Sequence, residues 1–395
     1  MSSPLQVGVY LADQNPHRDR SLGISTVTQS ILDGLSSEPN LALTAWTSRS
    51  ALRPEAAVPT RSLPFRTDKA ARRLLADTLH PWLIPARPDV WFYPKGYLSL
   101  LARPTRPALL LVHDAILDFY HRSYPEERSA ASYAYWLKVL ERSLRRADRI
   151  ATVSATSKRE LEHFAERRGF HPPPIDVVYA ACHYEHVPPC YTAKQDYVLH
   201  LASDAKHKRT RALLDLWRMG LAEGRDLPRL VLIGALSAEL TAYAQATTHV
   251  EVLPRQPESS LIAYYQNARA VLVPSEIEGF GLPVLEAYAL GTPACYTSGT
   301  SMEEVLAPYT SVGAFDLGTP ASFWNALDTA LRMERTDIET VRKKLLERYS
   351  KDSLRAHITA ALHRTAEAPA RKRLGVNRPV NKLRSIRTER VQPAG

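Results

Sequence analysis

The stretch Pro274-SEIEGFGLPVLEAYALGTPA-Cys295 directly follows a short apolar run, Ala270–Val273, that is typical of a buried β-strand. Gly279 and Gly281 permit a tight turn in which the backbone approaches a neighbour closely. A helix is expected to begin near Leu282, because the proline that follows suits a first helical turn. A strand that leads through glycines into a helix N-terminus is an anion site, and a diphosphate is the anion it suits.

Two glutamates flank this turn: Glu278 precedes it, and Glu286 lies one turn into the expected helix. A carboxylate repels a phosphate, so its useful role beside one is to accept hydrogen bonds from sugar hydroxyls. Glu286 is predicted to bind a ribose diol and Glu278 a hydroxyl of a second sugar. The alternative, a solvated helix face, is disfavoured by the Gly-Phe-Gly turn between the two glutamates.

Outward from this stretch, strand-like runs alternate with helix-period segments, which predicts an α/β fold with two parallel sheets. A polar loop, 13–22, precedes Gly23, which opens the first expected helix. Long helices are expected over 129–147 and 156–169, a linker over 183–196, and helices through most of 320–366. The expected strands are Leu5–Leu11, Leu41–Thr47, Asp89–Phe92, Ala108–Val112, Arg149–Val153, Ile175–Val178, Tyr197–Ala202, Leu230–Ile233, Val250–Leu253, Ala270–Val273 and Thr292–Tyr296.

Composition limits the classes of function. The chain of 395 residues has a net charge of +10 and only three cysteines, none in a metal-binding spacing. Its apolar runs are strand-sized, and its start lacks the pattern of a signal peptide, so we predict a cytoplasmic protein. Most of the excess charge lies in residues 369–395, which hold eight basic residues and one acid. This tail is predicted to be solvated and disordered or to tether the protein to an anionic membrane; without aromatic residues it does not suit nucleic acid.

The sequence EGFGLPVLEA, with Glu278 and Glu286 in an E-x7-E pattern, closely resembles the retaining GT-B glycosyltransferases of family 4. Four further segments are similar to family motifs in the same order: Leu111-VHDAILDFYHRSYPEE, Ala151-TVSATSKREL, Tyr197-VLHLASDAKHK and Ser301-MEEV. The resemblance implies two Rossmann-like domains facing each other across a cleft, followed by C-terminal helices and the basic tail. We expect an acceptor-side domain over 1–188, a donor domain over 189–350, a helix over 351–368 that crosses back to the first domain, and the tail over 369–395.

The resemblance also implies roles for individual residues. Glu278 would contact the donor sugar and Glu286 the ribose. Lys208 would neutralise the leaving diphosphate, and His113 would assist the acceptor or the sugar. The backbone around the glycine turn and the phosphate loops would complete the donor site, with Gly23, Ser203, His207, Gly279, Phe280, Gly281 and Leu282 as further donor-binding residues.

This chain departs from the family where relatives carry an arginine near the lysine. Ser203 stands at one such position and His207 at the other, so Lys206 or Arg209 is left to supply the missing charge. No Asp-x-Asp metal motif occurs in a suitable loop. We therefore expect no metal and no cofactor, since the nucleotide sugar is a substrate.

The predicted activity is retaining transfer of a hexosyl unit from a nucleotide-diphospho-sugar, with GDP-mannose favoured, to a glycan or lipid-linked acceptor in surface polysaccharide assembly. The carboxylates would serve by binding rather than as nucleophiles, with front-face attack assisted by the leaving phosphate. Two alternatives stay open: a catalytically inactive paralogue that acts as a binding subunit, and a sugar-nucleotide epimerase, against which the EGFGLP turn argues.

Overall fold

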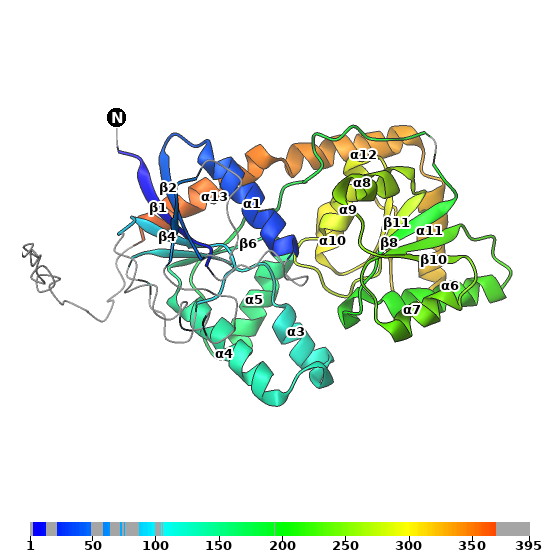
Figure 1. Ribbon diagram of the computed structural model, residues 1–395, viewed down its shortest axis with the longest axis horizontal. Helices are drawn as coiled ribbons and strands as arrows, with labels where there is room; N and C mark the ends of the chain where they lie inside the picture. The colour runs from blue at the N-terminus through cyan, green and yellow to red at the C-terminus, as the bar shows by residue number, and fades with distance from the viewer. Residues whose placement is uncertain are drawn as a thin grey trace, which may run out of the picture.

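The computed structural model describes residues 3–12, 22–48, 58–63, 72, 75, 87–98, 104, 106–192 and 194–368. The basic tail and the polar loop expected before Gly23 lie outside these residues, apart from Leu22 at the end of that loop. Two parallel sheets lie side by side along the chain, each with helices on its faces (Figure 1).

The N-terminal sheet has the strand order β3-β2-β1-β4-β5-β6-β7, and every pairing in it is parallel. Its first six strands have the order of a dinucleotide-binding fold. In this fold β2 and β3 are added on one side of β1, and the strands from β4 onward are added on its other side. The strands are β1 Leu5–Tyr10, β2 Leu41–Thr47, β3 Thr60–Ser62, β4 Val90–Tyr93, β5 Ala108–Leu111, β6 Arg149–Thr152 and β7 Ile175–Val177. The helices of this half are α1 Leu22–Ser36, α3 Ile116–Ser123, α4 Ala130–Arg146 and α5 Ala155–Arg167.

The C-terminal sheet repeats the same topology in the order β10-β9-β8-β11-β12-β13. Its strands are β8 Tyr197–Leu201, β9 Arg229–Ile233, β10 Val250–Leu253, β11 Ala270–Val273, β12 Ala294–Thr297 and β13 Ala314–Phe315. The helices are α6 Thr210–Ala222, α7 Ala238–Gln245, α8 Glu258–Asn267, α9 Leu282–Ala289, α10 Ser301–Leu306, α11 Pro320–Leu331, α12 Arg335–Arg348 and α13 Lys351–Ala366. The predicted α/β class with two Rossmann-like domains is confirmed.

Serine side chains cap the start of two helices in the first domain. Ser129 accepts a hydrogen bond from the Ser132 amide and caps α4, and Ser154 does the same for α5 through the Ser157 amide. Gly169 adopts a left-handed conformation with φ +67° just after α5 ends. Helix α3 is a difference from prediction, because the sequence pattern gave no helix over 116–123.

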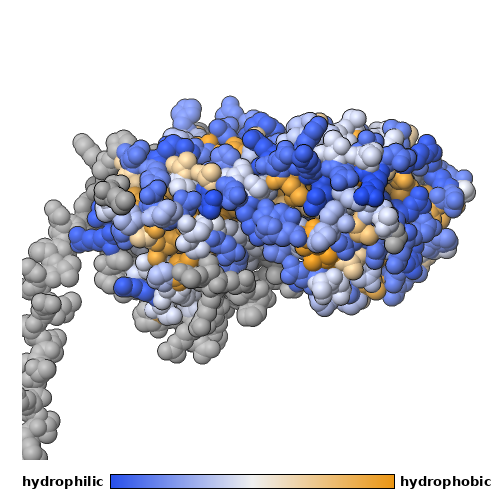
Figure 2. Space-filling view, turned by 90° about the horizontal axis from the view of Figure 1, so that it is seen from above, coloured by the Kyte–Doolittle hydropathy of each residue, from blue (hydrophilic) through white to orange (hydrophobic). Residues whose placement is uncertain are grey.

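The C-terminal helices join the two halves. α12 packs against α9 of the second domain, whereas α13 packs against α1 and strands β4, β5 and β6 of the first. In Figure 1 these helices run along the top of the molecule from the second domain back over the first. The face seen from above is mostly hydrophilic with small, separate apolar patches (Figure 2). Within the described residues, no helix combines the length and apolar character needed to cross a membrane.

Ile358→Ala tests how far α13 holds the first domain. Ile358 is fully buried, so truncation should leave a cavity and lower the free energy of unfolding by about 2–5 kcal/mol. Urea unfolding measures this loss. His357→Ala, at the exposed neighbouring position, is the control and should change stability by less than about 0.5 kcal/mol. Equal effects of the two substitutions would show that α13 is not anchored here.

A buried histidine on β8 ties the strand to the loop that follows it. His200 Nδ1 lies 2.9 Å from the Leu272 carbonyl oxygen, and Nε2 lies 3.0 Å from the Thr210 hydroxyl at the start of α6. Burial lowers the pKa of His200 from 6.5 to about 4. The neutral ring is therefore the form that the fold requires.

His200→Gln should flatten the dependence of stability on pH. Because the folded pKa lies below the unfolded one, the stabilisation is complete above pH 6.5 and is lost as pH falls from 6.5 towards 4. The parent should therefore lose roughly 2 kcal/mol more than the variant between pH 7 and pH 5. Urea unfolding at both pH values measures this, with exposed His186→Gln as the control. Parallel losses in parent and His200→Gln would contradict the assignment.

Candidate active site

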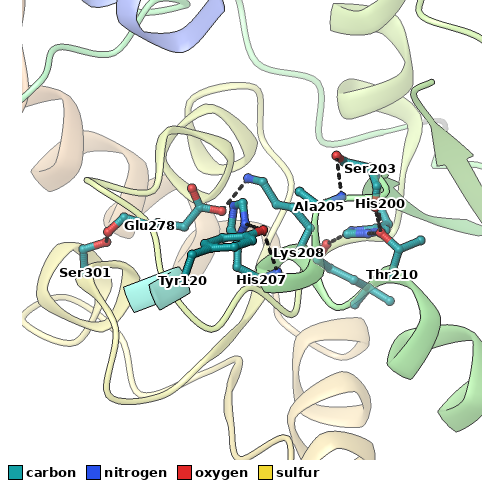
Figure 3. Close-up of polar contacts among 10 residues, drawn as sticks. Tyr120, His200, Ser203, Ala205, His207, Lys208, Thr210, Glu278 and Ser301 are labelled. Carbon is teal, nitrogen blue, oxygen red and sulfur yellow. Dashed lines mark hydrogen bonds and ion pairs between the residues drawn. The ribbon is translucent and has the colours of Figure 1, made fainter. Parts of the chain in front are cut away.

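Lys208 and Glu278 lie in the loops that follow β8 and β11, the two strands between which the strand order of the second sheet reverses. Lys208 ends a short 3-10 turn, Lys206–Lys208, that follows β8, and Glu278 follows β11, the neighbour of β8. Loops after neighbouring parallel strands meet at one edge of the sheet, which is where such sheets bind ligands. The Lys208 ammonium lies 2.5 Å from Glu278 Oε1 (Figure 3). The structure thus brings together two residues predicted from the sequence.

This ion pair fixes the charge of Glu278. Burial alone would raise the pKa of Glu278, but the attraction and hydrogen bond of Lys208 outweigh burial and hold the pKa below its usual value. Glu278 is therefore a carboxylate at neutral pH. The Ser301 hydroxyl donates to the Glu278 carbonyl oxygen at 2.9 Å and fixes the backbone from the other side.

The glycines after Glu278 are required by close approaches. Gly281 has φ +100°, which strains any L-residue, and an added Cβ would lie 2.6 Å from Met302 Cγ. At Gly279 an added Cβ would lie 3.0 Å from the His113 carbonyl oxygen, which belongs to the other domain. The ring of Phe280 is buried between Tyr179 and Tyr349. Phe280 can therefore offer a ligand its backbone but not its ring.

His113 follows β5 and is held in one tautomer. Its Nε2 lies 3.0 Å from the Pro94 carbonyl oxygen, which can only accept, so Nε2 carries the proton and Nδ1 is an acceptor. Burial lowers the pKa of His113 to about 4, so the ring is neutral at pH 7. The next residue, Asp114, accepts a hydrogen bond from the Ile116 amide. Burial raises the pKa of Asp114 to about 6, and the negative charges of Glu278 and Glu160 add to this effect.

Two sequence motifs join the domains. The hydroxyls of Ser154 and Ser157 donate to the Gly279 carbonyl oxygen at 2.6 and 2.8 Å. The carboxylate of Glu304 accepts from the amides of Ala155 and Thr156, both at 2.7 Å, at the N-terminus of α5. A carboxylate is favoured at this end of a helix. The residues of the Val-Ser-x-x-Ser and Ser-x-x-Glu-Val motifs therefore act here as an interdomain contact.

The loop after β8 also contacts α3 and the turn that follows it in the first domain. The Tyr120 hydroxyl lies 2.7 Å from His207 Nδ1. The Tyr124 hydroxyl donates to Glu276, and Arg209 lies 3.6 Å from the same carboxylate. Lys206 lies 3.9 Å from Glu127. Both cations left open as substitutes for the family arginine therefore already face a carboxylate.

The other predicted residues are spread more widely. The Ser203 hydroxyl accepts from the Ala205 amide and so supports its own loop. Glu286 accepts from the Tyr265 hydroxyl at 3.1 Å, and burial raises the pKa of Glu286. Gly23 lies in the first turn of α1, where an added Cβ would contact nothing. Leu282 begins α9 as expected.

Sequence reasoning missed Tyr120 of α3 and Tyr124, which follows this helix. Tyr120 is 87 residues from His207 in sequence, so no local pattern links them. The signal that was present is its place beside the His-Asp dipeptide, within the segment that resembles the family. No group of three or more His, Cys, Asp or Glu side chains is placed to hold a metal ion in the part of the chain that the structure describes.

Comparisons with known proteins agree with this geometry. Residues 192–351 match the family described as "Glycosyl transferases group 1". The O-antigen chain mannosyltransferase B of Escherichia coli is 26% identical over 310 residues, which is 73% of each protein. Two solved structures have the same fold. Sucrose-phosphate synthase from Thermosynechococcus elongatus has a TM-score of 0.69 at 13% identity, covering 91% of this chain and 98% of the other. HepE of Anabaena, in complex with UDP and glucose, has a TM-score of 0.65 at 16% identity, covering 91% and 100%.

Two doubly wound domains of this topology are the GT-B architecture that the similar structures share. Residues 192–351 thus form a glycosyl transferases group 1 domain within a GT-B fold.

Proposed function

We propose that this chain is a retaining, metal-independent hexosyltransferase. It uses a nucleotide-diphospho-sugar, with GDP-mannose favoured, and a glycan or lipid-linked acceptor in surface polysaccharide assembly. The observation that carries the proposal is the Lys208–Glu278 pair beside the N-terminus of α9. The similarity to the Escherichia coli O-antigen mannosyltransferase supports the donor and acceptor class, and HepE binds UDP with glucose in the same fold.

The diphosphate competes with Glu278 for the Lys208 ammonium. When Lys208 turns to the phosphate oxygens, the amides at the start of α9 add further donors, as helix N-termini do for phosphates. Glu278 is then released to accept hydrogen bonds from hydroxyls of the donor sugar. Charge that develops on the departing diphosphate is stabilised by fixed protein groups without a metal.

Glu286 suits the ribose of the donor. Its partly buried carboxyl group lies one turn into α9 and accepts a hydrogen bond from the Tyr265 hydroxyl, and burial raises its pKa. Two ribose hydroxyls would add the donors that a buried carboxylate otherwise lacks. Glu286 therefore contributes affinity for the nucleotide rather than chemistry.

For the reaction itself, we favour attack on the same face as the leaving group. The acceptor oxygen bonds to the anomeric carbon, the bond from that carbon to the diphosphate oxygen breaks, and the acceptor proton passes to the departing phosphate. His113 offers an unprotonated Nδ1 and so accepts a hydrogen bond from a sugar or acceptor hydroxyl.

Incubation with a panel of nucleotide sugars tests the proposal. Transfer, or slow hydrolysis, releases the nucleoside diphosphate, with GDP from GDP-mannose expected first. An epimerase would change the sugar without transfer to an acceptor or to water. An inactive binding subunit would release nothing and leave every sugar unchanged, and either of these results would reject the proposal.

Lys208→Ala should lower turnover about 10²–10³-fold, because one fixed donor to the departing diphosphate is lost. Release of nucleoside diphosphate under saturating donor measures the effect. The control is Lys206→Ala, two residues away on the same turn, whose half-exposed side chain should matter little. Near-parental turnover of Lys208→Ala would mean that Lys208 only balances Glu278.

Glu286→Ala should weaken nucleotide binding by about 1.5–3 kcal/mol, since hydrogen bonds to a charged group are lost. Titration calorimetry with GDP and UDP measures the affinity without the sugar. Glu339→Ala, exposed on α12, is the matched control. Equal affinities in Glu286→Ala and the parent would remove Glu286 from the nucleotide site.

A further inference from the structure

A tyrosine of the first domain reaches a histidine of the second at the edge of the proposed donor site. Tyr120 lies on α3, and its hydroxyl oxygen is 2.7 Å from His207 Nδ1. The backbone amide of His207 approaches the same oxygen at 3.4 Å. The two rings meet edge-on, with centroids 5.6 Å apart. Figure 3 shows the Tyr120 ring against His207, with Lys208 and Glu278 beside them.

One arrangement of protons satisfies both hydrogen bonds to this oxygen. The His207 amide can only donate, so it uses a lone pair of the phenolic oxygen. The single phenolic proton is then available for Nδ1, which accepts it. Burial, with the charge of Lys208 adding to it, lowers the pKa of His207 to about 4, so the ring carries one proton at pH 7. In this arrangement that proton lies on Nε2.

His207 Nε2 makes no hydrogen bond to any residue that the structure describes. The side chain is nevertheless buried, with 9% of the residue exposed. Its ring lies close enough to Lys208 and Glu278 for both charges to act on it. An N–H donor that no described residue accepts, beside the lysine proposed to bind a diphosphate, suits a phosphate oxygen.

We propose that Tyr120 is a positioning residue that holds His207 with its proton on Nε2, so that Nε2–H donates to the donor diphosphate beside Lys208. This inference rests on the proposed function, because it takes the diphosphate site from there. His207 then acts where similar glycosyltransferases carry an arginine, but as a neutral donor. Its orientation depends on the other domain, since Tyr120 belongs to α3.

Tyr120→Phe removes the proton that Nδ1 accepts while keeping the ring contact. His207 is then free to turn or to move its proton to Nδ1, and Nε2–H no longer faces the phosphate. We expect kcat/KM for the donor and the affinity for its nucleoside diphosphate to fall about five- to tenfold. The probes are GDP-mannose and UDP-glucose for turnover, and GDP and UDP for calorimetry.

A double-mutant cycle separates this role from a structural one. His207→Gln places an N–H donor near the position of Nε2 that needs no choice of tautomer. Tyr120→Phe should therefore cost less than twofold in the His207→Gln background. An equal cost in both backgrounds would overturn the inference. His207→Arg is a second background should the glutamine variant fold poorly.

Tyr133→Phe is the matched control for loosening of this region. The Tyr133 hydroxyl donates to the Tyr124 carbonyl oxygen at 2.9 Å, just after α3, and does not reach His207. We expect less than a twofold change in kcat/KM. A loss as large as that of Tyr120→Phe would show that packing around α3, rather than the histidine, sets the activity, and would overturn the inference.

Nitrogen chemical shifts of the His207 ring test the tautomer directly. In the parent, Nδ1 should have the shift of an unprotonated acceptor and Nε2 that of a protonated nitrogen, with signals assigned by their absence in His207→Gln. In Tyr120→Phe the Nδ1 signal should move. Protonated Nδ1 in the parent overturns the inference while leaving the proposed function intact. A parent that binds neither GDP nor UDP and releases no nucleotide overturns both, whatever the tautomer.

Discussion

The active site depends on how closely the two domains approach each other at Gly279. The Gly279 carbonyl oxygen accepts two serine hydroxyls from the first domain, and the missing side chain lets the His113 carbonyl lie against it. Glu278 is the preceding residue, so its carboxylate is placed by the same contact. A side chain at position 279 would push this turn away from the His113 carbonyl and shift Glu278, whose carboxylate pairs with Lys208. The glycine is thus a condition for a site assembled from two domains.

Charge balance is the second constraint on the site. Three positive charges of the loop after β8, at Lys206, Lys208 and Arg209, each lie within 4.0 Å of a carboxylate. A diphosphate that binds Lys208 must displace Glu278, so its affinity reflects the difference between two ion pairs rather than the whole of one. That exchange lowers ground-state affinity. The interaction of Lys208 with the diphosphate can then strengthen as negative charge grows on the leaving group. Stabilisation that appears only at this stage accelerates the reaction.

The sequence predicted the parts of this structure that local physics controls. Every expected strand is present and begins and ends within two residues of expectation, because parallel strands buried on both faces are continuous apolar runs. The sequence analysis missed two short strands at sheet edges, β3 and β13, of which β3 is exposed and has no apolar run. The largest shift is in β12, which begins at Ala294 instead of Thr292. The Thr292 hydroxyl donates to the Tyr265 carbonyl oxygen and lies beside Lys194, so Thr292 belongs to the preceding loop. Lys208 and Glu278 were each named from the sequence, and they meet because each follows one of two neighbouring strands, β8 and β11.

Contacts between the domains could not be predicted in the same way. Helix α3 offered only a weak pattern, with one buried residue, Asp118, whose carboxylate contacts Arg122 and Arg167. Tyr120 on this helix and Tyr124 just after it acquire their partners only when the second domain is in place. Glu304 was recognised as part of a motif, but its position at the N-terminus of α5 depends on a contact 149 residues away. Side chains that act across an interface leave no periodic signal in either segment.

The exchange of arginine for His207 links these points. A guanidinium carries its donors and its charge wherever its own domain lies. A neutral imidazole presents one N–H, and the other nitrogen must be satisfied for that N–H to be held in place. In this chain Tyr120 satisfies it from the opposite domain. Separating the two domains would therefore release the His207 N–H from its fixed position at the proposed diphosphate site, while Lys208 would stay in place. The second domain alone could still attract a nucleotide sugar through Lys208. It could bind the diphosphate fully only when the acceptor-side domain is closed over it.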